Sequence, residues 1–260
     1  MKKIKILVAA HKTFPMPLDH ELYLPVLVGA TNNYVSGMNY QRDDEGNNIS
    51  SKNPNYNELT AVYWAWKNLQ NADAVGLVHY RRYFFSGIRH KLEDVATYKD
   101  FEERLKTVDV ILPKKRNYYI ESNYSHYVHA HHAQPLDALR VLISKEYPTY
   151  LDSFDQVMSS RGAHMFNMFV MKKPLFDEYA GWMFGILEQL EKEVDISSYD
   201  AQEARVWGYL SELMMDVWIK KNNVKYSEMK WSQIGPKHTV NKMMNFLLRK
   251  FKVGGERTHF

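Results

Sequence analysis

The sequence contains no cysteine among its 260 residues. It can therefore form no disulfide, no thiolate zinc site and no cysteine nucleophile, which fits a protein of the reducing cytoplasm. It also lacks a long hydrophobic run, since no stretch approaches the ~18 apolar residues of a membrane span. The short apolar run 6–10 imitates a signal peptide but is interrupted by His11 and Lys12, so we expect no targeting segment.

Most of the chain also lacks an excess of charge of either sign. Residues 237–260 contain six Lys or Arg and one acidic side chain, whereas the preceding 236 residues contain 28 basic and 29 acidic ones. A nucleic-acid binder needs basic residues spread over a groove or face, so we expect no nucleic-acid partner. The 45% of apolar residues excludes a wholly disordered chain. We predict one catalytic domain at 1–236 and a basic tail at 237–260.

Predicted strands and helices alternate along the chain. Apolar runs predict buried strands at 4–10, 23–30, 74–78, 108–112 and 165–171. Apolar periodicity and capping residues predict helices at 57–69, 98–106, 136–145, 174–193 and about 200–221. The polar segment 31–56 is expected to be a long loop that could close over a ligand. This alternation predicts an α/β fold with a mainly parallel central sheet and a C-terminal helical segment.

In such sheets, ligands bind beyond the carboxyl ends of the strands. Three predicted strands end there: the first in Ala9-Ala10-His11-Lys12, the second in Val78-His79-Tyr80-Arg81-Arg82-Tyr83, and the third just before Lys114-Lys115-Arg116. Adjacent arginines make a fork that binds phosphate oxygens, and the histidine and tyrosines could hold a base or a sugar. The alternatives are an exposed turn for the first segment and, for the second, a surface strand end whose arginines pair with acids.

Asn57 and Glu58 lie where a loop leads into a helix, whose N-terminus favours anions. Glu58 could equally serve only to complement the helix dipole.

The second half of the chain holds three further groups of polar residues. His126, His129, His131 and His132 could make a metal site, bind sugar hydroxyls or phosphate, or be structural, and few acids lie near them. Arg161, His164 and Asn167 lie just before and within a predicted strand, where Asn167 interrupts an apolar run. The third group surrounds the start of the last helix and comprises Asp200, Gln202, Glu203, Arg205 and Glu212.

Glu203 falls on the same helical face as Trp207, Leu210 and Met214. A carboxylate on an apolar face can have a raised pKa and serve as a base, whereas the alternative is an exposed acid in a first helical turn.

The tail has an apolar stripe at Met243, Met244, Leu247, Leu248 and Phe251, with basic residues around it. Such a helix could lie on an anionic membrane surface or dock on the body of the protein.

Five segments in this order resemble a known family: LVAAHK, NYNELTAVYWAWKN, VGLVHYRRYF, HMFNMFVMKK and ARVWGYLSE. The sequence is similar, over about residues 4–235, to small bacterial glycosyltransferases long described as a domain of unknown function. They are encoded with capsule, exopolysaccharide and O-antigen clusters. The resemblance implies a GT-A-like, Rossmann-related fold and a UDP-sugar donor, with transfer of galactofuranose or galactose. The basic tail suits a lipid-linked acceptor at the inner face of the plasma membrane.

The resemblance also implies roles for individual residues. The donor would bind at His11, Lys12, Asn57, Glu58, His79, Tyr80, Arg81 and Arg82. The acceptor would bind at His129, His132, Arg161, His164, Asn167, Gln202 and Arg205. In a single displacement with inversion, the base would be Glu203 or Glu58, with Asp200 as a weaker candidate, and the arginines would stabilise the leaving diphosphate.

The sequence departs from the usual GT-A pattern at one point. Such enzymes hold a divalent cation with an Asp-x-Asp motif near this strand end, where this chain has His79-Tyr80-Arg81. We therefore assign no metal ligand; a Mn²⁺ or Mg²⁺ cofactor stays open, with the missing motif as the argument against it. The competing functions are a metal-dependent hydrolase built on the histidine cluster and a non-catalytic module that binds a nucleotide sugar.

Overall fold

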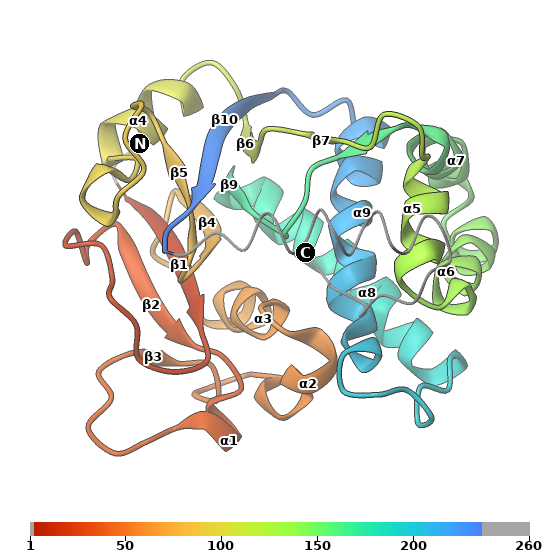
Figure 1. The fold of residues 1–260 in the computed structure, drawn as a ribbon, viewed down its shortest axis with the longest axis horizontal. Coiled ribbons are helices and arrows are strands. Elements are labelled where there is room, and N and C mark those ends of the chain that lie inside the picture. The colour runs from red at the N-terminus through yellow and green to blue at the C-terminus, as the bar shows by residue number, and fades with distance from the viewer. Residues whose placement is uncertain (1–2, 236–260) are drawn as a thin grey trace.

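An eight-stranded mixed sheet forms the centre of the computed structural model, which describes residues 3–235 (Figure 1). Its strands are β1 (Ile4–Ala10), β2 (Tyr23–Leu27), β3 (Gln41–Arg42), β4 (Ala74–His79), β5 (Arg82–Phe85), β6 (Val110–Pro113), β9 (Phe169–Lys172) and β10 (Tyr226–Gln233). Two short strands, β7 (Arg116–Asn117) and β8 (Gly162–Ala163), pair separately.

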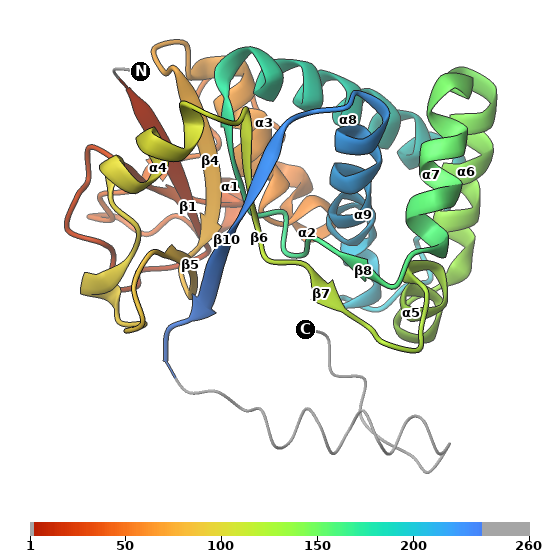
Figure 2. The same ribbon diagram turned by 90° about the horizontal axis from the view of Figure 1, so that it is seen from above.

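The sheet has four successive parallel strands in one half and mixed directions in the other. Strands β3, β2, β1 and β4 pair in parallel in that order, and so do β6 and β10. Strand β9 inserts antiparallel between β4 and β6, and β5 is antiparallel to both β4 and β10. The pairings of β4, β9, β6, β10 and β5 thus close into a ring, and β10 lies between β5 and β6 (Figure 2). The prediction of a mainly parallel sheet is therefore corrected to a mixed one.

Helices cover both faces of this sheet. Along β1, Leu7 and Ala9 point into one core, and Ile6 and Val8 into the other, because side chains alternate along a strand. The larger core contains residues of α3 (Leu59–Asn68), α6 (Ala133–Glu146), α7 (Leu151–Ser159), α8 (Lys173–Glu193) and α9 (Val206–Lys221). The smaller core is covered by α4 (Tyr98–Leu105), which begins with a capping box formed by Thr97 and Asp100.

Most predicted elements are found within a few residues of their expected bounds, but three are not. The last helix, predicted from about residue 200, begins only at Val206, after a 3-10 turn at Glu203–Arg205. The strand predicted at 165–171 begins only at Phe169, because Phe166 and Asn167 adopt left-handed φ angles of 73° and 53°. The segment 31–56 is not a bare loop, since it holds β3, a 3-10 turn (Ser50–Lys52) and α2 (Asn53–Tyr56), and α1 (Ala30–Asn33) covers its start. Strands β5 and β10 and helices α5 (Asn123–Ala130) and α7 were not predicted.

The predicted basic tail at 237–260 lies outside the described residues, and so does its predicted boundary at 236–237. Across residues 3–235, we find no helix that combines the length and the apolar character needed to cross a bilayer.

Candidate functional site

A cavity of about 980 Å³ opens beyond the carboxyl ends of β1, β2 and β4. Parallel strands bring Ala10, Val28 and His79 to the same edge of the sheet, and all three line the cavity. The opposite wall is formed by α2, by the start of α3 and by the segment that leads into α9. The cavity therefore lies where α/β sheets bind their ligands.

The HYRRYF segment is a β-hairpin at the edge of this cavity. His79 of β4 pairs with Arg82 of β5, and Tyr80 and Arg81 form the two-residue turn between them. A turn of two residues requires antiparallel strands, which explains why β5 reverses direction here. The second tyrosine of the motif, Tyr83, is fully buried in the core and does not line the cavity.

Aromatic rings gather next to the hairpin turn. The ring of Tyr80 stacks on Phe14 at a centroid distance of 3.7 Å, and His11 meets both rings edge-on at 5.4 and 5.5 Å. The guanidinium of Arg81 lies 5.0 Å from the Tyr80 ring. Burial, together with the positive charges of Lys12 and Arg81, lowers the pKa of His11, so this edge-on imidazole is neutral at pH 7. His11, Tyr80 and Arg81 line the cavity, whereas Phe14 supports the Tyr80 ring from outside the cavity wall.

Phe166 connects several groups of the site. Its carbonyl oxygen lies 2.6 Å from Nε2 of His79, so this ring nitrogen carries a proton and donates it. Burial lowers the pKa of His79, which is therefore neutral. The guanidinium of Arg82 lies 4.3 Å from the centre of the Phe166 ring. A left-handed φ is rare for a bulky residue, and such strain concentrates at functional sites.

Glu212 lines the same cavity from α9. Burial raises the pKa of Glu212 to about 7, and the negative charge of Glu58 is the second cause of the rise. A backbone hydrogen bond from Phe166 and the charges of Arg82 and Arg116 act in the opposite direction. A carboxylate with a pKa near 7 can accept a proton under physiological conditions and release it again. Glu212 was noted in the sequence without a role; its helix position alone gave no sign of this environment.

Glu58 is held in place by Asn167. Nδ2 of Asn167 donates to Glu58 at 2.7 Å and to the Gly208 carbonyl at 3.1 Å, while its Oδ1 accepts from Ser211 at 2.9 Å. Every hydrogen-bonding group of this buried amide side chain is thus engaged with the wall of the site. Asn167 is thus a buried, fully hydrogen-bonded residue whose direct side-chain partners are Glu58 and Ser211, and its predicted role in binding an acceptor stays a prediction.

The remaining wall of the cavity is fixed by Asn57 and Arg205. Nε of Arg205 donates to Oδ1 of Asn57 at 2.7 Å, and Asn57 adopts a left-handed φ of 51°. Gly208 makes the contact possible, because a Cβ at this position would lie 2.4 Å from Nδ2 of Asn57. Helix α9 therefore carries a glycine where it approaches α2 and the cavity.

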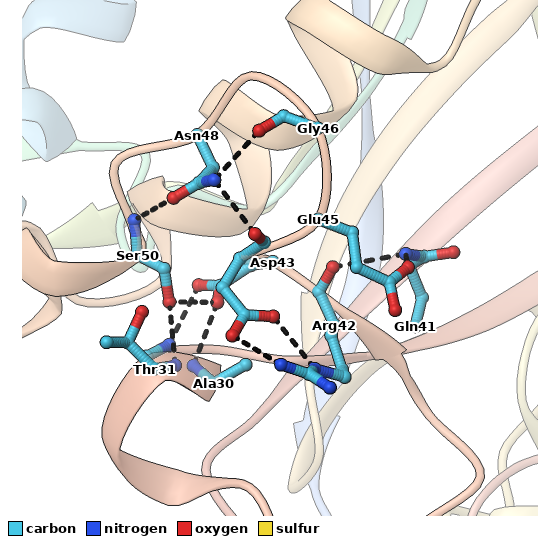
Figure 3. A network of polar contacts seen from close by, with 11 residues as sticks. Ala30, Thr31, Gln41, Arg42, Asp43, Glu45, Gly46, Asn48 and Ser50 are labelled. Carbon is cyan, nitrogen blue, oxygen red and sulfur yellow. Dashed lines mark hydrogen bonds and ion pairs between the residues drawn. The ribbon is translucent and has the colours of Figure 1, made fainter.

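A buried carboxylate fixes the loop that follows β2. Asp43 is fully buried and accepts from the backbone of Gly29 at 2.8 Å, from that of Ala30 at 2.9 Å and from the Ser50 hydroxyl at 2.5 Å (Figure 3). Gly29 precedes α1 with a left-handed φ of 63°. The network ties the 31–56 segment to the end of β2, next to Val28 of the cavity wall. This network therefore braces the segment against the end of β2, whereas closure of the segment over a ligand stays a prediction.

The structure brings most of the predicted donor residues together. Of these, His11, Asn57, Glu58, His79, Tyr80, Arg81 and Arg82 line the cavity, as do Gln202 and Arg205 from the predicted acceptor set. Lys12 does not line it. The sequence reasoning missed Phe166, Tyr209 and Gln233, which also line it. Of these three, only Phe166 could have been found from the sequence, because the polar Asn167 follows it within an apolar run.

Other predicted residues lie elsewhere. Glu203 is not on the cavity wall; it pairs with His132 at 3.1 Å, and this hydrogen bond lowers its pKa. Asp200 accepts hydrogen bonds from the backbone of Gln202 and Glu203. Arg161 contacts the carbonyl oxygen of Tyr119 on an exposed surface. The structure therefore gives Glu203 and Asp200 local structural partners.

The histidine cluster is divided among different partners. His126 and His129 both bind Glu121, at 2.8 and 3.0 Å, whereas His131 stacks on Tyr209. His164 is buried between Asp216 at 2.5 Å and Glu228 at 3.2 Å, away from the cavity wall. These histidines do not converge on one point.

A divalent cation does not fit the residues at the end of β4. There, the side chains of His79, Tyr80 and Arg81 replace the acidic pair expected in GT-A enzymes, and guanidinium groups repel a cation. Throughout residues 3–235, no three His, Asp or Glu side chains are arranged to hold a metal ion. The cationic groups fit an anionic ligand instead.

The chain is similar to other proteins in sequence and in fold. Residues 5–223 match the model of a family described as a domain of unknown function, DUF4422. No curated protein matches the sequence. The fold is similar to a solved structure described as the apo form of the bifunctional glycosyltransferase WbbM, with a TM-score of 0.78 and 30% identity. The match covers 90% of this chain and 46% of that chain, so the present chain spans less than half the length of WbbM.

Proposed function

The chain belongs to the DUF4422 family, which confirms the resemblance seen in its sequence motifs, and we propose that it is a glycosyltransferase that uses a nucleotide sugar. The observation that carries this proposal is a single cavity that combines arginine side chains with Glu212, a carboxylate whose pKa is about 7. Such a combination suits a reaction in which a diphosphate leaves and a hydroxyl loses its proton. Similarity to a protein described as a bifunctional glycosyltransferase supports it.

The donor is a UDP-hexose, with galactofuranose or galactose as the transferred sugar. The ring of Tyr80, which lines the cavity and is held by its stack on Phe14, offers a surface for the uracil base. Arg81 and Arg82 then lie next to the base, where they bind the diphosphate, and Arg205 adds a third guanidinium to the cavity wall. These cations stabilise the charge that develops on the leaving UDP, so this chain's own residues perform the task that a metal ion performs elsewhere.

Glu212 is the base in this proposal. An acceptor hydroxyl oxygen forms a bond to the anomeric carbon while the bond from that carbon to the UDP oxygen breaks, with inversion. The hydroxyl proton passes to the Glu212 carboxylate, and UDP leaves with the electron pair of the broken bond. Glu58 stands beside Glu212 and contributes to its raised pKa, while its own hydrogen bond to Asn167 suits a positioning role.

Glu212 thereby replaces Glu203 as the first candidate. A general base near neutral pH needs a pKa close to the working pH, and the hydrogen bond from His132 moves the pKa of Glu203 in the opposite direction. Asp200 serves to cap the turn before α9.

The acceptor in this proposal is a growing capsule, exopolysaccharide or O-antigen glycan on a lipid carrier. Gln202 and Arg205 lie on the side of the cavity that faces α9, where an acceptor sugar would meet Glu212. The basic, amphipathic sequence of 237–260 suits attachment to the inner face of an anionic membrane.

A non-catalytic module that binds a nucleotide sugar would use the same arginines and aromatic rings. The raised pKa of Glu212 favours an enzyme, because binding alone has no use for a proton acceptor. No observation favours a hydrolase built on the histidines, since their partners differ.

The test is transfer of radiolabelled hexose from a panel of UDP-sugars to a lipid-extractable product, in membranes that contain the acceptor glycan. We expect label in the lipid fraction from one donor and none with the Arg81→Gln/Arg82→Gln variant. Binding of that donor without any turnover would instead support the non-catalytic module.

A further inference from the structure

A second hollow, which we call the basic groove, lies beside the donor cavity. It has a volume of about 450 Å³ and is lined by His90, Lys114, Lys115, Arg116, Phe166, Lys230 and Trp231. Five of these seven side chains are basic and none is acidic. The sequence points to 114–116 only as a strand end where a ligand could bind, and the proposed donor site gives these basic residues no role.

Two lysines of the groove lie side by side on neighbouring strands. Met229 of β10 pairs in parallel with Pro113 of β6, and the backbone N–H of Lys114 continues the ladder by donating to Met229. The next residues, Lys114 and Lys230, therefore occupy adjacent positions, and both line the groove. Like charges in adjacent positions repel, so this arrangement costs stability unless an anion lies between them.

These two lysines are not neutralised by the protein. Within the described part of the chain, neither Lys114 nor Lys230 has a carboxylate within 4.0 Å, whereas Lys115 lies 3.7 Å from Asp216. Burial lowers the pKa of Arg116, which means that this guanidinium sits in a partly dehydrated position on the groove wall. A dehydrated guanidinium beside two uncompensated ammonium groups is a typical setting for phosphate.

The groove borders the place where transfer would occur. Phe166 lines both hollows, and its backbone binds His79 and Glu212 of the donor cavity. Arg116 is near enough to Glu212 to lower its pKa. Trp231 adds an apolar surface on the groove wall, in edge-on contact with Phe166 at 4.7 Å. An acceptor bound in the groove can therefore extend past Phe166 toward Glu212.

We propose that the basic groove binds the phosphate or diphosphate group of the acceptor substrate, with Lys114, Lys230 and Arg116 as its ligands. This inference rests on the proposed transferase function, because it assigns the second substrate of that reaction. A diphosphate-linked lipid carrier and a free glycosyl phosphate share this chemistry. The carrier would also place its hydrocarbon chain near Trp231.

The test is isothermal titration of the full chain with inorganic pyrophosphate and with geranyl diphosphate, with the donor cavity saturated by UDP. We expect both probes to bind, and the Lys114→Gln/Lys230→Gln variant to lose at least about tenfold in affinity for each, since hydrogen bonds from charged donors are the strong ones. The control variant Lys106→Gln/Lys220→Gln removes the same charge from exposed positions at the C-terminal ends of α4 and α9, and should bind both probes as the wild type does. Tighter binding of geranyl diphosphate than of pyrophosphate would identify the lipid carrier as the source, and equal binding would identify a glycosyl phosphate.

Unchanged pyrophosphate affinity in the groove variant, or equal losses in the groove and control variants, would overturn the proposal. The two proposals can fail separately. If UDP does not bind but the groove variant loses pyrophosphate, the anion site stands and the donor assignment falls. If UDP binds equally to the wild type and the groove variant while pyrophosphate binding does not depend on the two lysines, only the groove assignment falls.

Discussion

Glu212→Gln tests the proposed chemistry at one atom. The substitution keeps the size of the side chain and an oxygen that can accept the Phe166 hydrogen bond, but it removes the proton acceptor. General bases contribute about 10²–10⁴-fold to rate. We therefore expect the rate of transfer to fall by about 10²–10⁴-fold, with little change in the affinity for the donor, whose diphosphate meets the arginines.

The pH dependence follows from the pKa of about 7. Only ionised Glu212 can act as a base, so the wild-type rate should rise about tenfold per pH unit below 7 and level off above it. The Glu212→Gln variant should lack this rise. The assay is release of UDP from the donor in the presence of acceptor, measured from pH 5 to 9.

Glu203→Gln is the matched control, because it makes the same change just before the same helix and outside the cavity. It should retain activity within about tenfold of the wild type. The reasoning is refuted if Glu212→Gln also stays within tenfold, or if Glu203→Gln alone shows the large loss.

Three further outcomes are expected. Glu212→Gln should raise the melting temperature at pH 8 by several degrees and leave it unchanged at pH 4. The reason is that a pKa raised from 4.5 to about 7 means that the ionised Glu212 carboxylate destabilises the folded state by ~3 kcal/mol. An equal shift of the melting temperature at both pH values would contradict this account of the Glu212 charge. Gly208→Ala should weaken donor binding and lower the melting temperature, since its Cβ would clash with Asn57, whereas Gly87→Ala meets nothing and should be neutral in both measurements. Asp43→Ala should destabilise the fold by ~2–5 kcal/mol in chemical denaturation, because it leaves two buried backbone N–H groups and a hydroxyl without their acceptor; a loss below ~1 kcal/mol would show that the network does not hold the loop.

The regular elements were predictable because their signals are local. The apolar run of β1 and the helical periodicity of α8 each reflect burial that the sequence records directly. Strand β10 was missed because exposed and buried residues are mixed along it, and its place between β5 and β6 depends on residues more than 100 positions away. The prediction of strand direction was wrong for the same reason, because nothing in the sequence of β9 shows that it runs antiparallel to its neighbours.

The residues of the candidate site also divide into those that local sequence reveals and those that only the fold reveals. His79, Arg81 and Arg82 could be found because charged residues directly follow a buried strand. Glu212 could not be chosen over Glu203, because the pKa of each depends on its neighbours in space: Glu58 and a buried wall for the former, His132 for the latter. The left-handed turn at Phe166 and Asn167 looked like a strand, since its apolar residues are typical of one.

The central claim is that the cavity at the ends of β1 and β4 binds a nucleotide sugar through its arginines. Isothermal titration of UDP and UDP-sugars against the wild type and the Arg81→Gln/Arg82→Gln variant tests it most directly, with chelator present in all samples. The account predicts saturable binding of UDP to the wild type and at least a tenfold weaker affinity in the variant. Absence of UDP binding to the wild type, or equal affinity in the two proteins, would contradict it.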